Sequence, residues 1–387
     1  MARKPLLLLL LLSFSSSFAQ DQQPQSPTTP LVPALFVIGD SSVDCGTNNY
    51  LGTVARADRP PYGRDFDTHN ATGRFSNGRV VVDYLALNLG LPFVPAYLGW
   101  MSGNYQDMIH GMNYASAAAG IFFSSGSDMV MKGRTNKQGQ HVSLTQQIQQ
   151  FSDTAQQLSL RLGPGPAADL IARSVVYVSI GSNDFIHLYL ANSSNIQSEY
   201  LPWEFSHILA SNLKQELKNL YNTNARKVVV MGIAPLGCTP HYLFEYRSQD
   251  GRCIKEINNA IIEFNFELKY MVNELNKELT RAQFTFCDAF EGSMDILANQ
   301  RLYGFETTTE ACCGMGLYGG WIMCLLPEMA CQNASTHVWW DEFHPTDAVN
   351  KILAENVWSG LHVKMCYPMN LQEMVTQAPS PTPAQVS

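Results

Sequence analysis

A serine stands where an α/β protein could use it for chemistry. Gly39-Asp40-Ser41 directly follows the apolar run Ala34 to Ile38, which has the length and composition of a buried strand. A serine hydroxyl becomes a nucleophile when a base takes its proton, a third group orients that base, and hydrogen-bond donors stabilise the oxyanion. Ser41 is therefore the candidate nucleophile. The alternative is that it is an ordinary turn or capping serine.

Histidine is the usual base because its pKa lies near physiological pH. An aspartate three residues before a histidine could orient it, and this spacing occurs in Asp107/His110, Asp184/His187 and Asp341/His344. The spacing alone does not choose among them, because each pair could also belong to a solvated polar surface. Asp341/His344 is favoured, since it lies in a late loop just before a helix. Asp184/His187 remains a competitor because it follows a predicted strand.

Backbone N–H groups at strand-to-helix turns are natural donors to an oxyanion, and each is typically worth about 3 kcal/mol of barrier. The Ser41 amide and an amide of the small-residue segment 116–120 have this position. The side-chain amide of Asn183 could add a further donor, although Asn183 could equally be a helix N-cap. The Gly-X-Ser-X-Gly elbow of ordinary α/β-hydrolases is absent from the sequence.

Short apolar runs alternate with longer segments of helical periodicity, which predicts an α/β fold with a mainly parallel sheet covered on both faces. Strands are predicted at 34–38, 112–115, 174–180, 227–231 and 284–287. Helices are predicted at about 80–89, 143–162, 202–221, 253–279 and 347–361. No interior linker separates two cores, so we predict one domain over residues 34–368. Ligands of such folds bind at the carboxyl ends of the strands, where Ser41 is expected.

The bulk composition excludes some classes of function. The chain has 387 residues, of which 45% are hydrophobic, and a net charge of -8, so a nucleic-acid partner is not expected. It contains neither Cys-X-X-Cys nor His-Glu-X-X-His, which disfavours a zinc site. Residues 20–33 are predicted to be a flexible lead-in. Residues 369–387, rich in Pro, Ser and Thr, are predicted to be a disordered tail.

Several features indicate secretion. Residues 1–19 read as a signal peptide, because a positive start, the apolar run 6–12 and a small-residue cleavage pattern follow one another. No other segment approaches the length of a membrane span. Asn70, Asn192 and Asn333 stand in N-glycosylation sequons. Nine cysteines in an oxidising compartment should mostly pair, and Cys287, on a predicted buried strand, is our candidate for the unpaired thiol.

Four motifs occur in an order that is typical of one family. They are Gly39-Asp40-Ser41, Gly111-Met112-Asn113-Tyr114-Ala115-Ser116, Gly181-Ser182-Asn183-Asp184 and Asp341-X-X-His344-Pro345. With the segments 73–78 and 311–314, they make the chain similar to a plant GDSL-type esterase/lipase of the SGNH hydrolase superfamily. The resemblance covers nearly the whole mature chain.

The resemblance implies a three-layer α/β/α fold with a five-stranded, mainly parallel sheet. It implies Ser41 as nucleophile, His344 as general base and Asp341 as the residue that orients it. Asn183 and the Ser41 amide would donate to the oxyanion, and His187 would be a bystander. It implies no metal or organic cofactor, a small-molecule or lipid ester as substrate and water as acyl acceptor. We also expect the protein to be a monomer.

Two positions depart from the family pattern. Ser42 stands where the family name predicts leucine, which makes Ser42 a backup nucleophile. Ala117 stands where the second motif often has glycine. Its backbone N–H survives that change, so Ala117 is expected to complete the oxyanion hole, with Gly120 as the alternative donor.

The function expected from these observations is that of a secreted serine ester hydrolase that forms an acyl-enzyme on Ser41. Two other enzymes would use the same residues: a carbohydrate O-acetylesterase and an extracellular acyltransferase that assembles polyesters. A protein of another class, a secreted binding or defence protein with a silent site, is the remaining alternative.

Overall fold

The structure is a computed structural model that describes residues 29–100, 108–122, 124–126, 139–192 and 194–377. The predicted signal peptide and the start of the lead-in lie outside these residues, as do Asp107 and the last part of the predicted tail. A six-stranded sheet forms the centre, in the order β2-β1-β3-β4-β5-β8. The strands are β1 (Leu35–Gly39), β2 (Gly111–Asn113), β3 (Val175–Ser179), β4 (Lys227–Met231), β5 (Gln283–Cys287) and β8 (Cys366–Tyr367).

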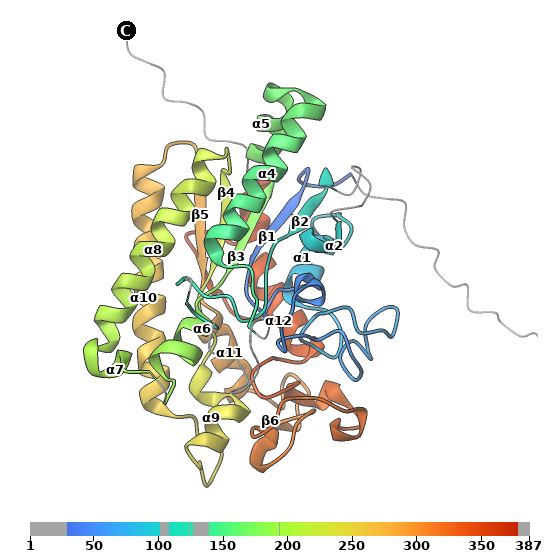
Figure 1. The fold of residues 1–387 in the computed structure, drawn as a ribbon, viewed down its shortest axis with the longest axis vertical. Helices are drawn as coiled ribbons and strands as arrows, with labels where there is room; N and C mark the ends of the chain where they lie inside the picture. Colours follow the sequence, from blue (N-terminus) through green and yellow to red (C-terminus); the bar gives the residue numbers. More distant parts are fainter. Residues whose placement is uncertain (1–28, 101–107, 123, 127–138, 193, 378–387) are drawn as a thin grey trace, which may run out of the picture.

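Helices cover both faces of this sheet, so the predicted three-layer α/β/α fold is confirmed. One face is covered by α4 (Leu144–Leu162), α5 (Pro164–Arg173), α8 (Pro202–Asn222) and α10 (Lys255–Glu278). The other is covered by α1 (Val81–Asn88), α11 (Ala289–Ala298), α12 (Asp347–Ser359) and α13 (Leu371–Thr376). In Figure 1, α4 and α8 lie in front of the sheet and α12 lies behind it.

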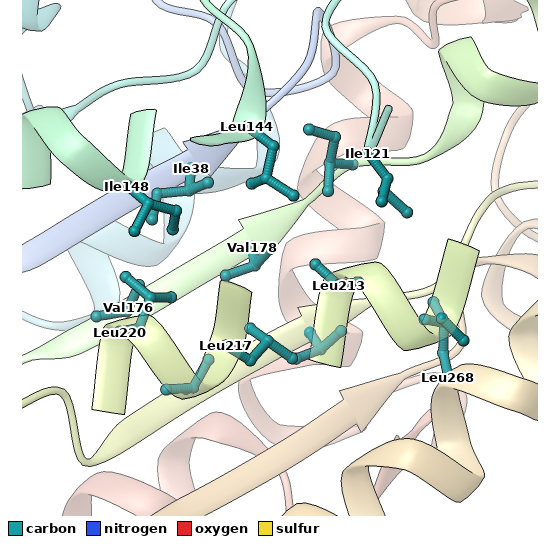
Figure 2. Close-up of a cluster of buried hydrophobic side chains, with 14 of the residues drawn as sticks. Ile38, Ile121, Leu144, Ile148, Val176, Val178, Leu213, Leu217, Leu220 and Leu268 are labelled. Carbon is teal, nitrogen blue, oxygen red and sulfur yellow. The ribbon is translucent and has the colours of Figure 1, made fainter. Parts of the chain in front are cut away.

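Burial on both faces explains why β1 is a continuous apolar run. Successive strand side chains point to opposite faces. Phe36 and Ile38 therefore pack in the layer of α4 and α8, whereas Leu35 and Val37 pack in the layer of α1 and α12. Figure 2 shows the first of these layers, in which residues of the sheet meet leucines and isoleucines of α4, α8 and α10.

The sheet has one strand more than the five predicted. Strands β2, β1, β3, β4 and β5 are parallel, but β8 adds to β5 in antiparallel orientation through Phe286↔Tyr367 and Cys287↔Cys366. A strand of two residues is too short to show any periodicity, so the sequence pattern could not indicate it.

Both predicted flexible ends are partly ordered. The end of the lead-in is fixed, because Leu31 N–H donates to Leu89 O at 3.0 Å and Val32 is buried. Part of the segment predicted to be a disordered tail from residue 369 is a helix instead. Leu371 and Met374 of α13 are fully buried in the core, and Asn370 caps this helix by accepting from Glu373 N–H at 2.8 Å.

The prediction that Cys287 is unpaired is wrong. Cys287 forms a disulfide with Cys366, directly across the β5–β8 pair. The other disulfides are Cys238–Cys253, Cys312–Cys331 and Cys313–Cys324, and the free cysteine is the buried Cys45. The last two hold the segment between the short strands β6 (Thr307–Ala311) and β7 (His337–Trp339), which pair with each other.

The remaining short elements lie in the connections. They are α2 (Tyr97–Trp100), α6 (Ser182–Asp184), a π-helical turn (Phe185–Tyr189), α7 (Ile196–Glu199) and α9 (Pro240–Glu245), with 3₁₀ turns at Thr47–Tyr50, Leu236–Cys238, Leu317–Gly319, Pro327–Met329 and Ala334–Thr336. Of the helices in the described residues, none combines the length and the apolar composition that a membrane crossing requires.

Candidate active site

The end of β1 is held in one position by close backbone packing. A Cβ at Gly39 would lie 2.3 Å from Ser179 O of the neighbouring strand, so only glycine fits there. The side chain of Gln147 on α4 accepts from Gly39 N–H at 2.8 Å and donates to Gly39 O at 2.9 Å. The chain then turns at Asp40, whose carbonyl accepts from Val43 and Asp44. Ser41 stands on this fixed turn.

The structure brings Ser41, His344 and Asp341 together. Ser41 Oγ lies 2.8 Å from His344 Nε2, although the two residues are 303 positions apart. His344 Nδ1 lies 2.8 and 2.9 Å from the two carboxylate oxygens of Asp341. The Asp341 carboxylate also accepts from the backbone N–H groups of Phe343 and His344, at 3.0 and 2.8 Å. The loop that carries the histidine is thus folded around the aspartate.

Two aromatic residues that the sequence analysis did not identify complete this arrangement. The Tyr62 hydroxyl donates to Asp341 Oδ2 at 2.8 Å, and the Phe75 ring lies 4.9 Å from the His344 ring, centroid to centroid. Tyr62 belongs to none of the sequence motifs described above. Phe75 belongs to the segment 73–78 that contributed to the family resemblance. Arg74 holds that segment in place through two buried hydrogen bonds to Asp83, at 2.8 and 2.7 Å.

The pKa shifts of His344 and Asp341 suit a general base and the carboxylate that orients it. Burial lowers the pKa of His344, but the charge of Asp341 and its hydrogen bond raise it more, so that the pKa lies above the ordinary 6.5. Burial disfavours the ionised form of Asp341, but the interaction with His344 outweighs this and lowers the pKa of Asp341 below 3.8. Asp341 is therefore ionised when His344 titrates.

Of the two competing Asp/His pairs, the aspartate of Asp184/His187 is engaged elsewhere. The Asp184 carboxylate accepts from Ile121 N–H, Phe122 N–H and Ser125 Oγ, at 2.7, 2.9 and 2.6 Å, so it anchors a loop. Burial raises the pKa of Asp184 to about 6. His187 lines the same cavity as Ser41. His110 lies beside the segment 92–95, away from this cavity, and its proposed partner Asp107 is outside the described residues.

Ser42, the backup nucleophile, is directed to other partners. Its Oγ donates to Asp40 Oδ1 at 2.7 Å and lies 3.0 Å from Ser179 Oγ. Burial is the main cause that raises the pKa of Asp40. Of the two adjacent serines, Ser41 is the one in contact with His344.

The structure shows how the predicted oxyanion donors are engaged in the absence of a substrate. Ala117 N–H donates to Asp44 Oδ2 at 3.1 Å, so this amide is already occupied. The next residue, Ala118, lines the cavity in a left-handed conformation with φ of 69°, and among the described residues its N–H has no acceptor. The same holds for Ser41 N–H. Gly120, the alternative donor, does not line the cavity.

Asn183 also lines the cavity, and its Nδ2 donates to Ala119 O at 2.9 Å. An amide nitrogen carries two hydrogens, so one remains for a ligand. Ser41, Ala118 and Asn183 thus all offer hydrogen-bond donors within the lining of the cavity that contains Ser41. The left-handed alanine is a strained conformation of the kind that collects at functional sites.

The cavity around Ser41 has a volume of about 260 Å³ and is lined mainly by apolar side chains. Part of this apolar lining comes from the layer behind the sheet: Val81, Met231, Ala289, Ile296, Leu297, Val349 and Leu353. The lining also includes the charged residues Arg56, Arg59 and Glu342. Within the described part of the chain, no group of three or more His, Cys, Asp or Glu side chains is arranged to hold a metal ion.

Comparisons with known proteins agree with this geometry. The family model described as GDSL-like lipase/acylhydrolase matches residues 35–357. GDSL esterase/lipase 7 of Arabidopsis thaliana is 40% identical over 374 residues, which cover 95% of this chain and 97% of that protein. Another GDSL esterase/lipase of Arabidopsis thaliana is 38% identical over 353 residues, or 90% of this chain and 89% of that protein. The chain therefore belongs to the GDSL-like lipase/acylhydrolase family, and it is a carboxylic ester hydrolase.

Proposed function

We propose that the enzyme hydrolyses esters through an acyl-enzyme on Ser41, with His344 as general base and Asp341 as the residue that orients it. The observation that carries this proposal is the 2.8 Å contact between Ser41 Oγ and His344 Nε2. His344 takes the serine proton as Oγ attacks the ester carbonyl, and then gives a proton to the leaving alcohol. In a second step, His344 acts again as general base and takes a proton from the water that attacks the acyl-enzyme.

The oxyanion of each tetrahedral intermediate is stabilised by Ser41 N–H, Ala118 N–H and the side-chain amide of Asn183. The first two have no acceptor among the described residues, and the third has a hydrogen to spare. Asp341 holds the imidazole in the tautomer whose Nε2 faces Ser41, and it stabilises the imidazolium. The Tyr62 hydroxyl, bonded to Asp341 Oδ2, keeps that carboxylate in place.

In this proposal, the apolar lining contributed by α1, α11 and α12 takes the acyl chain. The lining by α1, α11 and α12 extends well beyond what an acetyl group can cover, which favours longer acyl chains over the O-deacetylation of carbohydrates. The assembled contacts of Ser41, His344 and Asp341 favour an active enzyme over a binding or defence protein with a silent site.

We further propose that the enzyme is secreted. Three observations support this: the signal-like residues 1–19, the four disulfides, and the exposure of all three sequon asparagines. N-glycosylation at Asn70, Asn192 and Asn333 and a monomeric state stay predictions.

The pH profile of ester hydrolysis tests the assignment of the base. Only the neutral imidazole can take the serine proton, so kcat/KM rises with pH as His344 loses its own proton. Because Asp341 raises this pKa, we expect the midpoint of the rise above pH 6.5. The measurement is kcat/KM of a neutral p-nitrophenyl ester from about pH 4 to about pH 9.

His187 supplies the matched control for this profile. In His187→Gln the midpoint should stay where it is in the parent enzyme, because His187 is not the base. A profile that is flat over this range, or a midpoint that moves in His187→Gln, would contradict the role of His344.

The proposed acyl side can be tested at Ala289, a buried residue of α11 that lines the cavity. Ala289→Leu should block two or three methylene positions, and each buried methylene is worth about 0.8 kcal/mol. The preference for an octanoyl over an acetyl ester should therefore fall roughly thirtyfold. Ala298→Leu, at the exposed end of the same helix, is the control. An unchanged preference in Ala289→Leu would show that the acyl chain lies elsewhere.

A further inference from the structure

The turn that carries the proposed oxyanion donor Ala118 has an uncommon backbone for its sequence. Ala119 N–H donates to Ser116 O at 3.1 Å, which closes a four-residue turn with Ala117 and Ala118 in the middle. Of these two central residues, only Ala118 has a positive φ, of 69°. This is the pattern of a type II turn, whose third position favours glycine because a side chain there is strained. Two alanines would by themselves favour the type I turn.

The two turn types differ in the orientation of the middle peptide, here the one between Ala117 and Ala118. From type I to type II, this peptide is turned over by roughly half a revolution. It is a trans peptide, so the Ala117 carbonyl and the Ala118 N–H point in opposite directions. Whatever holds the carbonyl therefore also aims the N–H that we propose as an oxyanion donor.

The side chain of Asn48 holds the carbonyl of Ala117. Its Nδ2 donates to Ala117 O at 3.0 Å and, with its second hydrogen, to Ala55 O at 2.8 Å. Its Oδ1 accepts from Ser116 Oγ at 2.6 Å. Asn48 is only 1% exposed, and these three contacts leave its amide a single orientation. Asn48 does not itself line the cavity, so it acts on the site through the peptide that it holds.

Asp44 fixes the backbone on which Asn48 stands. Its Oδ1 accepts from the N–H groups of Gly46 and Thr47, at 2.7 and 2.8 Å, where the 3₁₀ turn that carries Asn48 begins. Its Oδ2 accepts from Ala117 N–H at 3.1 Å, which fixes the peptide before the one that Asn48 holds. Two successive peptides of the donor turn are thus held by the segment that follows the nucleophile.

We propose that Asn48 is a positioning residue for catalysis, which holds the Ala117–Ala118 peptide in the orientation that directs the Ala118 N–H to the oxyanion. This inference rests on the proposed function. Without the amide of Asn48, the strain at Ala118 would favour the type I turn, and the peptide would turn over. The Ala117 carbonyl would then take the place of the N–H, and its partial negative charge would repel the oxyanion instead of stabilising it.

Asn48→Asp tests this role with almost no change in the shape of the side chain. The substituted side chain keeps an oxygen for Ser116 Oγ, but a carboxylate cannot donate to Ala117 O and can instead accept from the turned-over Ala118 N–H. We expect kcat for a p-nitrophenyl ester to fall at least about a hundredfold, the effect of losing one oxyanion donor, with little change in KM. Asn48→Ala should also lower kcat, and it serves as the test if Asn48→Asp does not fold.

The substitution Ala118→Gly provides a rescue that a purely structural role of Asn48 does not predict. Glycine adopts a positive φ without strain, so it should restore the type II turn when the Asn48 amide is missing. We expect Asn48→Ala/Ala118→Gly to have a kcat roughly tenfold above that of Asn48→Ala, which corresponds to the strain removed. Each kcat is measured at a temperature at which the variant is fully folded, so a change in stability alone would leave it unmoved.

Asn276→Ala is the matched control. Asn276 Nδ2 donates to Phe284 O and its Oδ1 accepts from Phe284 N–H, both at 2.8 Å, and neither residue lines the cavity. We expect a lower unfolding temperature and an unchanged kcat. An unchanged kcat in Asn48→Asp and Asn48→Ala, a loss confined to KM, or a double variant no more active than Asn48→Ala would overturn the inference. A parent enzyme without esterase activity would instead overturn the proposed function, and this inference with it.

Discussion

Ser41→Ala should reduce ester hydrolysis by at least about 10⁴-fold, because no other hydroxyl is in contact with His344 Nε2 among the described residues. Removal of a nucleophile leaves only the oxyanion donors and substrate binding, which give a small residual rate. The measurement is the steady-state rate on a p-nitrophenyl ester, with the folded state of the variant checked by thermal unfolding.

Ser42→Ala is the matched control, since its hydroxyl is bonded to Asp40 and Ser179 and not to the histidine. We expect Ser42→Ala to retain the nucleophile and to react with a fluorophosphonate probe, whereas Ser41→Ala should not react. A labelled peptide that carries the probe on Ser42, or a Ser41→Ala enzyme with full activity, would show that Ser41 is not the nucleophile.

Removal of the Cys287–Cys366 disulfide should have the largest effect on stability. The bond closes a loop of 79 residues, for which the loss of chain entropy in the unfolded state predicts about 4.5 kcal/mol. It also fixes the short edge strand β8, which otherwise has only two residues of pairing. The measurement is the free energy of unfolding in urea of Cys287→Ala/Cys366→Ala under oxidising conditions.

The Cys238–Cys253 disulfide offers a matched comparison, because it closes a loop of only 15 residues and should contribute about 3 kcal/mol. The double alanine variant of that pair should therefore be less destabilised. If the Cys238–Cys253 variant loses as much free energy of unfolding as the Cys287–Cys366 variant, or more, loop length does not set the contribution of these disulfides. Native contacts near residue 253 would then matter more.

The residues that meet in the site could be predicted where each follows a recognisable strand end. Ser41 follows β1 and Asn183 follows β3, and the carboxyl ends of adjacent parallel strands meet at one edge of the sheet. Spacing alone could not identify Asp341 and His344, because the sequence contains two other Asp-X-X-His pairs. The order of the motifs resolved that ambiguity, and the contact of His344 with Ser41 agrees with it.

Other features could not be predicted, for physical reasons. The choice between Ala117 and Ala118 depends on which amide Asp44 occupies, and that contact joins residues 73 positions apart. Tyr62 reaches Asp341 from an irregular loop, where no periodicity indicates burial. The pairing of Cys287 with Cys366 follows from an edge strand too short to leave a pattern.

The separation of 303 residues between Ser41 and His344 has a consequence for biosynthesis. The hydroxyl leaves the ribosome early, but the imidazole that we propose as its base emerges only when most of the polypeptide has been made. We therefore expect a chain that ends before His344 to be inert towards esters, however well its first strands have formed. On this proposal, hydrolytic turnover reports that the loop with His344 has docked onto the turn with Ser41.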